Sequence, residues 1–162
     1  MNVKFFLRHF YLTSYQIKFL IKISQIFFKI PLIGKILSIW VDNLILHLYG
    51  VELKSTSLFV KDLVIGHSTG LVLGGNGITC SGKLHVSSGV VFARRYNNVE
   101  SVISNNKFFE IEGDLTIGAN SVLLGPLKIK GPVIIGAMSL VSHDINQPGI
   151  YVGSPAKLIK KL

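Results

Sequence analysis

Apolar residues recur every six positions through most of this chain of 162 residues. A period of six fits neither the 3.6-residue repeat of a helix nor the two-residue alternation of a single strand. It is typical of a β-solenoid, in which each hexapeptide forms a short strand and a turn, and three hexapeptides close one coil. We expect thirteen residues to point inward and to stack from coil to coil: Leu53, Phe59, Ile65, Leu71, Ile78, Leu84, Val90, Ile111, Ile117, Leu123, Ile129, Ile135 and Val141.

Residues 1–50 differ from the repeat in composition. They contain six basic residues and one acidic residue among many aromatic and aliphatic side chains. A nucleic-acid-binding arm is usually hydrophilic, whereas a basic and apolar segment is typical of a helix at a membrane surface. The polar residues of its first part fall on one side of a helix: Lys4, Arg8, Ser14, Lys18, Lys22, Gln25 and Lys29.

We therefore expect two amphipathic helices in this segment, separated near Pro31 and Gly34. In this interpretation the first helix lies at the inner surface of the membrane, with its lysines toward anionic lipid headgroups. The alternative is that both helices pack on the rest of the protein or on a neighbouring subunit. No window of about 18 residues is free of charge, which argues against a spanning helix.

Three stretches match a known family. They are residues 65–70 (Ile-Gly-His-Ser-Thr-Gly), residues 117–126 (Ile-Gly-Ala-Asn-Ser-Val-Leu-Leu-Gly-Pro) and residues 151–157 (Tyr-Val-Gly-Ser-Pro-Ala-Lys). From about residue 50 onward the chain resembles the hexapeptide-repeat acyltransferases, in particular the serine acetyltransferase branch and its shorter relatives in polysaccharide gene clusters. The resemblance implies a left-handed parallel β-helix, a homotrimer with active sites between neighbouring solenoids, and acetyl-CoA as the acetyl donor.

The chain is thus expected to be mainly β, with an N-terminal α-helical segment. Residues 1–50 form the amphipathic helices, and residues 51–158 form the β-helix domain. The repeat is interrupted by a polar loop at residues 93–110, which we expect to protrude. A basic tail, residues 159–162, ends the chain.

Transfer of an acetyl group from a thioester to a hydroxyl needs a base that is largely neutral at working pH, and imidazole meets this need. Of five histidines, His67 lies inside a matched motif, and the family's histidine at this place is the general base. Its usual partner is a carboxylate fifteen residues upstream, which here is Glu52 in place of an aspartate. The alternative is that His67 is a plain corner residue and Glu52 an exposed acid. For the remaining histidines we expect packing or surface roles: His9, His47, His85 and His143.

The resemblance also implies residues that bind the donor. The pantetheine arm of acetyl-CoA would lie beside the small side chains of Ala119 and Ala137, and Lys157 would contact the phosphates. The loop arginines Arg94 and Arg95 would contact phosphate of a lipid-linked sugar or of coenzyme A. A plain solvated loop is the alternative for this pair.

Two departures from the family concern the acceptor. The aspartate that precedes the catalytic histidine in serine acetyltransferases is Gly66 here, and an Arg-His pair is replaced by Lys107 and Phe108. The family residues hold the charged groups of an amino acid, so their loss favours a neutral acceptor such as a sugar. Phe108 would offer an apolar face to the sugar ring, although paired phenylalanines are more often packing residues.

The sequence therefore predicts an acetyl-CoA-dependent O-acetyltransferase that modifies a surface polysaccharide (capsule, exopolysaccharide or lipopolysaccharide) or its lipid-linked precursor. We expect it in the cytoplasm, peripheral on the inner face of the bacterial membrane, with no nucleic-acid partner. The alternatives are a short serine O-acetyltransferase and a non-catalytic membrane-bound scaffold. We expect no metal, because one cysteine and scattered histidines lack ligand spacing. The lone Cys80 is expected to be an inert packing residue.

Overall fold

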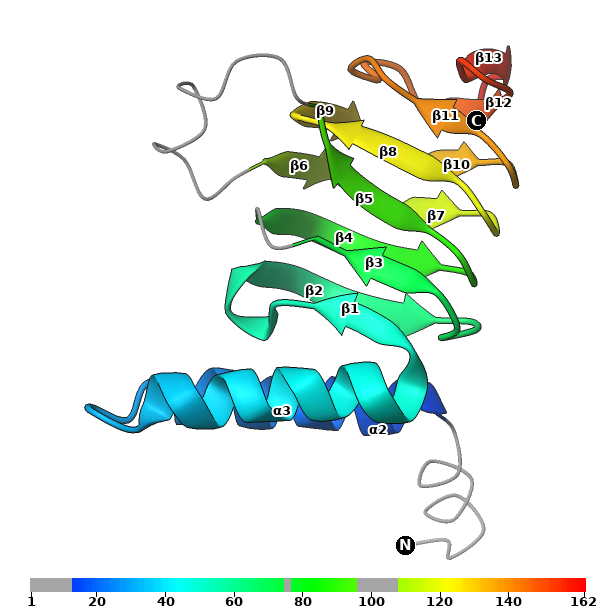
Figure 1. The fold of residues 1–162 in the computed structure, drawn as a ribbon. Helices are drawn as coiled ribbons and strands as arrows, with labels where there is room; N and C mark the ends of the chain where they lie inside the picture. The colour runs from blue at the N-terminus through cyan, green and yellow to red at the C-terminus, as the bar shows by residue number, and fades with distance from the viewer. Residues whose placement is uncertain (1–12, 75–76, 96–107) are drawn as a thin grey trace, which may run out of the picture.

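The structure is a computed structural model that describes residues 13–74, 77–95 and 108–162. Two helices lie side by side below a stack of short strands (Figure 1). The helices are α2 (Thr13–Phe27) and α3 (Gly34–Tyr49). The strands are β1 (Val51–Leu53), β2 (Leu58–Ile65), β3 (Leu71–Leu73), β4 (Ile78–Val86), β5 (Val91–Arg94), β6 (Phe109–Glu112), β7 (Leu115–Ile117), β8 (Val122–Gly125), β9 (Leu127–Lys130), β10 (Val133–Ile135), β11 (Leu140–Val141), β12 (Gly149–Val152) and β13 (Lys157–Lys160), with a 3-10 turn, η1 (Ser55–Ser57), after β1.

The strands form two long parallel stacks. One sheet has the order β1-β3-β5-β8-β11, and the other has the order β13-β12-β10-β7-β4-β6-β9, with β2 beside β4. Strand β4 is long enough to serve two faces of the solenoid, because its first part pairs with β6 and its last part with β7. All of these pairs are parallel except β12–β13.

The coils follow a left-handed path. In Figure 1 the chain runs from right to left along the front sheet, returns behind it and rises. In register, Val51 pairs with Leu71 and Leu115 with Val133, which gives coils of 20 and 18 residues (71 − 51 and 133 − 115). The predicted mainly β fold, a left-handed parallel β-helix with an N-terminal helical segment, is confirmed.

The core is a single stack of apolar side chains inside the solenoid. Of the thirteen residues expected to point inward, eleven are buried. Phe59 is 57% exposed and Leu53 is only partly buried, so the prediction was wrong for these two. The physical reason for Phe59 is a register shift in the pairing of β2 with β4, between Val60 and Asp62. The irregularity places Leu58 in the core instead.

Several polar side chains of α2 contact the solenoid. Ser14 accepts a hydrogen bond from the backbone N–H of Ile65 (3.2 Å), and the Gln25 amide donates to two carbonyls at η1 and the start of β2 (2.9 and 3.1 Å). Lys18 lies 3.9 Å from a carboxylate oxygen of Asp62. The first coil has no coil below it, so its backbone groups need other partners, and α2 supplies them. Two members of the predicted polar side lie outside the described residues: Lys4 and Arg8.

A buried polar cluster joins the two helices to the solenoid. The Asp42 carboxylate of α3 accepts hydrogen bonds from the hydroxyl of Ser24 (2.9 Å) and from the hydroxyl and backbone N–H of Ser55 (2.5 and 3.1 Å). The hydroxyls of Ser24 and Ser38 are 2.8 Å apart across the helix pair. Neither described helix is sufficiently long and apolar to cross a bilayer.

Candidate functional site

The turn that carries His67 is one of a stack of similar turns. The backbone N–H of Gly66 donates to the carbonyl of Val86 in the next coil (2.9 Å), and Gly118 donates in the same way to Ile135 (2.8 Å). The other bonds of this ladder join Ser87 to Ile117 and Gly136 to Tyr151 (3.2 and 2.8 Å). We call this stack of turns, residues 66–70, 87–89, 118–121 and 136–139, the corner column.

Each turn of the corner column contains one residue in the left-handed region. These residues are Gly70, Gly89, Asn120 and Met138, with φ values of 71°, 67°, 57° and 56°. Glycine at position 89 is required for space as well as for its φ, because the side-chain oxygen of Asn120 occupies the place where a Cβ would lie. The small residues of the repeat therefore allow the turns to stack tightly.

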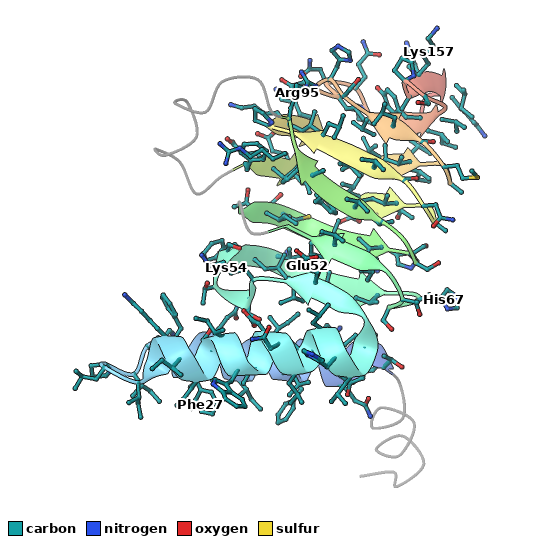
Figure 2. All side chains as sticks on the ribbon, viewed as in Figure 1. Phe27, Glu52, Lys54, His67, Arg95 and Lys157 are labelled. Carbon is teal, nitrogen blue, oxygen red and sulfur yellow. The ribbon has the colours of Figure 1, made fainter. Side chains whose placement is uncertain are left out.

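The corner column brings three predicted site residues onto one edge of the molecule. His67 lies in its lowest turn, and Ala119 and Ala137 lie in consecutive turns above, joined by a hydrogen bond from Met138 N to Ala119 O (2.8 Å). His67 and Ala137 are exposed and Ala119 is half-buried. In Figure 2 the His67 ring projects from the solenoid at this edge. The arrangement provides an exposed imidazole next to a strip of small side chains.

Lys157 belongs to the upper end of the same column. It is exposed on β13 and pairs in register with Val152 of β12. The Val152 side chain in turn packs over Gly136, where a Cβ would meet it at 2.7 Å. Figure 2 shows Lys157 on the side of the solenoid from which His67 projects. A positive charge thus lies beyond the last turn of the small-residue strip.

Glu52 does not contact His67 within the chain. Glu52 pairs in register with Val72, five positions after His67, so the two residues occupy different places around the coil. Both side chains are exposed, and no hydrogen bond or ion pair joins them among the residues described. The spacing of fifteen residues alone does not bring the carboxylate to the imidazole.

A second histidine lies beside His67, and sequence reasoning missed it. A Cβ at Gly66 would lie 3.2 Å from Nε2 of His85, so the His85 ring lies against the residue that precedes His67. His85 is half-buried on β4, one coil above Val64, with which it pairs in register. Gly66, which stands where the family motif has an aspartate, is therefore the residue beside which His85 lies. The six-residue period did not indicate this proximity, because the local coil has 21 residues (85 − 64) and places His85 above Val64 and not above His67.

The predicted acceptor residues lie away from His67 in the same chain. Strands β3 and β5 are parallel neighbours. His67 lies before the start of β3, and Arg94 lies at the end of β5, so the two residues are at opposite ends of these strands (Figure 1). The Arg95 guanidinium donates to the carbonyl of Ser142, which gives it a structural partner. Lys107 lies outside the described residues.

Phe108 is a packing residue. Its ring is half-buried and lies edge-on to Phe109, with the ring centroids 5.4 Å apart. A Cβ at Gly125 would meet the Phe108 ring at 2.5 Å. The ring is held between these neighbours, so it does not present the open apolar face expected for a sugar.

Cys80 is buried, with its Sγ near the carbonyls of Gly82 and Gly113 (3.6 and 3.5 Å). Burial raises the pKa of this thiol above its usual value, so it stays protonated near neutral pH. Within residues 13–74, 77–95 and 108–162, no three or more His, Cys, Asp or Glu side chains cluster in a way that could hold a metal ion.

Comparisons with known proteins relate this geometry to an enzyme family. No protein-family model matches the chain. A serine acetyltransferase of Buchnera aphidicola subsp. Schizaphis graminum is 27% identical over 126 residues, which are 78% of this chain and 46% of that protein. The chain is similar to serine acetyltransferases. It spans less than half the length of such curated relatives, with 46% and 45% covered in two Buchnera proteins.

Solved structures of serine acetyltransferases share the fold. The Neisseria gonorrhoeae enzyme superposes with a TM-score of 0.73 at 24% identity, over 94% of this chain and 57% of that one. The Brucella abortus enzyme in complex with coenzyme A gives a TM-score of 0.75 at 17% identity, over 93% and 57%. The serine acetyltransferase-like β-helix predicted from the sequence is thereby confirmed.

The comparisons contradict the predicted saccharide acceptor. The relatives and structural neighbours described above are serine acetyltransferases, so the alternative, a short serine O-acetyltransferase, fits better than modification of a polysaccharide. The packing of Phe108 agrees with this correction, because its half-buried ring lies against Phe109 and Gly125. The loss of charged family residues at Gly66 and Phe108 therefore did not justify the change of acceptor.

Proposed function

We propose that this chain is an acetyl-CoA-dependent O-acetyltransferase of the serine acetyltransferase type, with the hydroxyl of serine as its acceptor. The observation that carries the proposal is the corner column, which places the exposed His67 imidazole on the same edge as Ala119 and Ala137. An extended thioester can lie along this strip, because methyl side chains leave room beside the backbone. Lys157, at the upper end, suits the phosphates of coenzyme A.

In the proposed reaction His67 acts as the general base. Its neutral imidazole removes the proton from the serine hydroxyl while that oxygen attacks the thioester carbonyl. The C–S bond then breaks, the acetyl group stays on the serine oxygen, and the imidazolium returns its proton to the leaving thiolate as free coenzyme A. Transfer is direct, without an acetyl-enzyme intermediate, because the one cysteine is buried and protonated. These steps need no contact between Glu52 and His67, and none is present within the described part of the chain.

We further propose that His85 helps to hold the acceptor. Its Nε2 lies next to Gly66, the residue immediately before His67, and its ring is partly open to solvent. In the tautomer with a proton on Nε2, the ring can donate a hydrogen bond to the carboxylate of serine. This contact would take the place of a charged side chain at position 66, where the chain has glycine.

A trimer is part of the proposal. His67 and the Arg94 end of β5 lie at opposite ends of the same sheet, so one chain alone does not enclose a site around the imidazole. Neighbouring solenoids packed side by side would bring these ends together. Light scattering coupled to size-exclusion chromatography of the full chain measures the mass directly, and a monomer at micromolar concentration would contradict this part.

The decisive experiment measures release of coenzyme A from acetyl-CoA with serine as acceptor. His67→Ala should lower kcat by about 10²–10⁴-fold. His143→Ala is the matched control, because His143 is an exposed histidine whose Nδ1 lies 3.0 Å from the hydroxyl of the neighbouring Ser142, and it should keep the full rate.

A His67→Ala variant that keeps the full rate would contradict the mechanism. A wild-type protein that acetylates another hydroxyl compound but not serine would contradict the acceptor alone. A folded wild-type protein that releases no coenzyme A with any acceptor would favour the scaffold alternative.

A further inference from the structure

The helix pair presents a broad apolar surface on the sides that do not contact the solenoid. We call it the basal face, and its members are exposed side chains of α2, α3 and their connection: Phe19, Ile26, Leu32, Ile33, Ile36, Ile39, Trp40, Leu44 and Leu48. Trp40 is 73% exposed. Figure 2 shows side chains that project from the helices away from the strands, with Phe27 among them. Soluble monomers rarely expose apolar surface of this extent, so the basal face has the character of an interaction site.

The basal face follows from the sequence of α3, which is apolar nearly all around. Its buried residues, Gly34, Ser38 and Ile45, lie within about 40° on a helical wheel at 100° per residue. Most residues on the rest of the circumference are nevertheless aliphatic or aromatic. A helix that is hydrophobic all round is normally buried or in contact with lipid. Helix α2 and the solenoid together cover only a narrow strip of this one.

The charges around the basal face are almost all positive. Residues 13–50 contain four lysines and one carboxylate, Asp42, and the carboxylate is turned inward by its hydrogen bonds to Ser24 and Ser55. Lys22, Lys29 and Lys35 are exposed. The exposed surface of the helix pair therefore combines apolar side chains with cations and lacks a free carboxylate among its described residues.

The lysines of α2 lie between the basal face and the solenoid. Lys18 reaches toward Asp62 on β2, and Lys22 lines a groove of about 590 Å³ between α2 and β2, together with Lys61. The apolar residues of α2, Phe19 and Ile26, lie farther round the helix and are exposed. From the outer side of the helix pair toward the solenoid, apolar side chains therefore come before ammonium groups. A membrane interface has the same arrangement by depth, with lysines reaching back toward the headgroups.

We propose that the basal face binds the surface of an anionic lipid bilayer, with the solenoid standing above it. The helices of 15 and 16 residues would lie in the plane of the interface. The mostly apolar groove of about 560 Å³ would face the acyl chains, and it is lined by Phe27, Leu37, Trp40, Val41, Asn43, Leu44 and His47. Phosphate groups would lie level with the lysines. In this orientation the apolar sides of both helices enter the membrane, and the lysines reach the headgroups as expected from the sequence.

The single tryptophan of the chain makes this directly measurable. The full chain is mixed with phosphatidylcholine vesicles that contain or lack phosphatidylglycerol, and Trp40 emission is followed together with co-sedimentation. We expect a blue shift and co-sedimentation with the anionic vesicles, and weaker binding in high salt or to neutral vesicles. No shift and no co-sedimentation with anionic vesicles would overturn the proposal.

Two matched pairs of variants test the surface itself. Ile39→Glu should weaken vesicle binding by about tenfold or more, whereas Ile159→Glu, at a similarly exposed isoleucine of β13, should not. Lys22→Gln should weaken binding about fivefold, and Lys130→Gln on β9 should not. Circular dichroism confirms that each variant folds.

The competing occupant is a second copy of this chain. In that case Trp40 would emit at short wavelength without lipid, and dilution would shift the emission to longer wavelength as the complex dissociates. That result, or equal loss of vesicle binding in both members of a matched pair, would also overturn the proposal.

Discussion

The solenoid and the helix pair use apolar residues in different ways. In the solenoid, Ile117, Leu123 and Ile135 are covered by the residues one coil above and one coil below, and all three are buried. In the helix pair, Ile17, Ile21 and Ile45 are buried, but larger side chains such as Trp40 and Phe19 are exposed. A repeating structure covers its own core, whereas two helices on the end of it can bury only one side each.

This difference suggests that the solenoid and the helix pair have separate roles. The corner column, with His67 and the small-residue strip, is built entirely from the solenoid. The helices close the lower end of the solenoid through Ser14, Gln25 and Asp42, and leave their apolar sides open. Chemistry and attachment are then properties of separate surfaces, and changes to one should not affect the other.

The largest expected effect compares a buried leucine of the solenoid with an exposed leucine of the helix pair. Leu123→Ala in β8 removes a fully buried side chain and should lower the free energy of unfolding by about 2–5 kcal/mol. Leu44→Ala in α3, where the leucine is 45% exposed, should change it by about 0.5 kcal/mol or less. Urea denaturation followed by circular dichroism measures both. Equal losses would mean that protein already covers the outer side of α3, and the contrast between the regions would fail.

The next effect concerns the junction between the regions. Asp42→Ala leaves the hydroxyls of Ser24 and Ser55 without their acceptor and should cost about 1–3 kcal/mol. Asp62→Ala is the control, since its contact with Lys18 is a partly exposed ion pair at 3.9 Å worth about 1 kcal/mol or less. Thermal unfolding of the two variants compares them. A greater loss for Asp62→Ala would show that the buried cluster does not anchor the helices.

A smaller effect is expected within the solenoid at the proposed acceptor contact. His85→Ala should raise KM for serine about tenfold, equivalent to about 1.4 kcal/mol, with little change in kcat. Thr116→Ala is the matched control, because Thr116 lies next to His85 in register on β7. Steady-state kinetics with acetyl-CoA held saturating separates the two constants. An unchanged KM with a reduced kcat would assign His85 to the transition state and not to acceptor binding.

The smallest effect tests how closed the solenoid core is. Burial raises the pKa of Cys80, so the thiolate fraction at pH 8 is lower than for an ordinary cysteine. Alkylation by iodoacetamide should therefore be slow in the folded protein and fast in urea, as measured by mass spectrometry. Because the chain has one cysteine, the reading is unambiguous. Rapid modification of the folded protein would show that the coil around β4 opens readily.

The sequence predicts those structural features that depend on the local spacing of residues. The six-residue period identified the stacked core from Ile65 to Val141, because a solenoid repeats the same contacts in every coil. It failed at Phe59, where an irregularity in β2 shifts the alternation by one residue. The motif around His67 predicted a turn at an exposed edge, and Ala119 and Ala137 lie on the same edge. Their roles in binding and catalysis remain proposals.

Relations between coils were harder to predict. The fifteen-residue spacing suggested a Glu52–His67 contact, but a coil of 20 residues places Val72, not His67, beside Glu52. Phe108 was expected to meet a substrate and instead packs against Phe109 and Gly125. The polar residues of α2 were expected to face lipid headgroups, but Ser14 and Gln25 form hydrogen bonds with backbone groups of the first coil.

The sequence by itself determined the fold class and the position of the stacked core, because each hexapeptide carries its own inward residue and its own turn. Only the tertiary structure decided which side chains meet across coils, above all His85 beside Gly66, because this depends on the number of residues in each coil. It also decided which side of the helices is exposed. The backbone groups at the open end of a parallel stack need hydrogen-bond partners, and polar side chains of α2 supply them. The apolar sides of both helices are therefore left exposed.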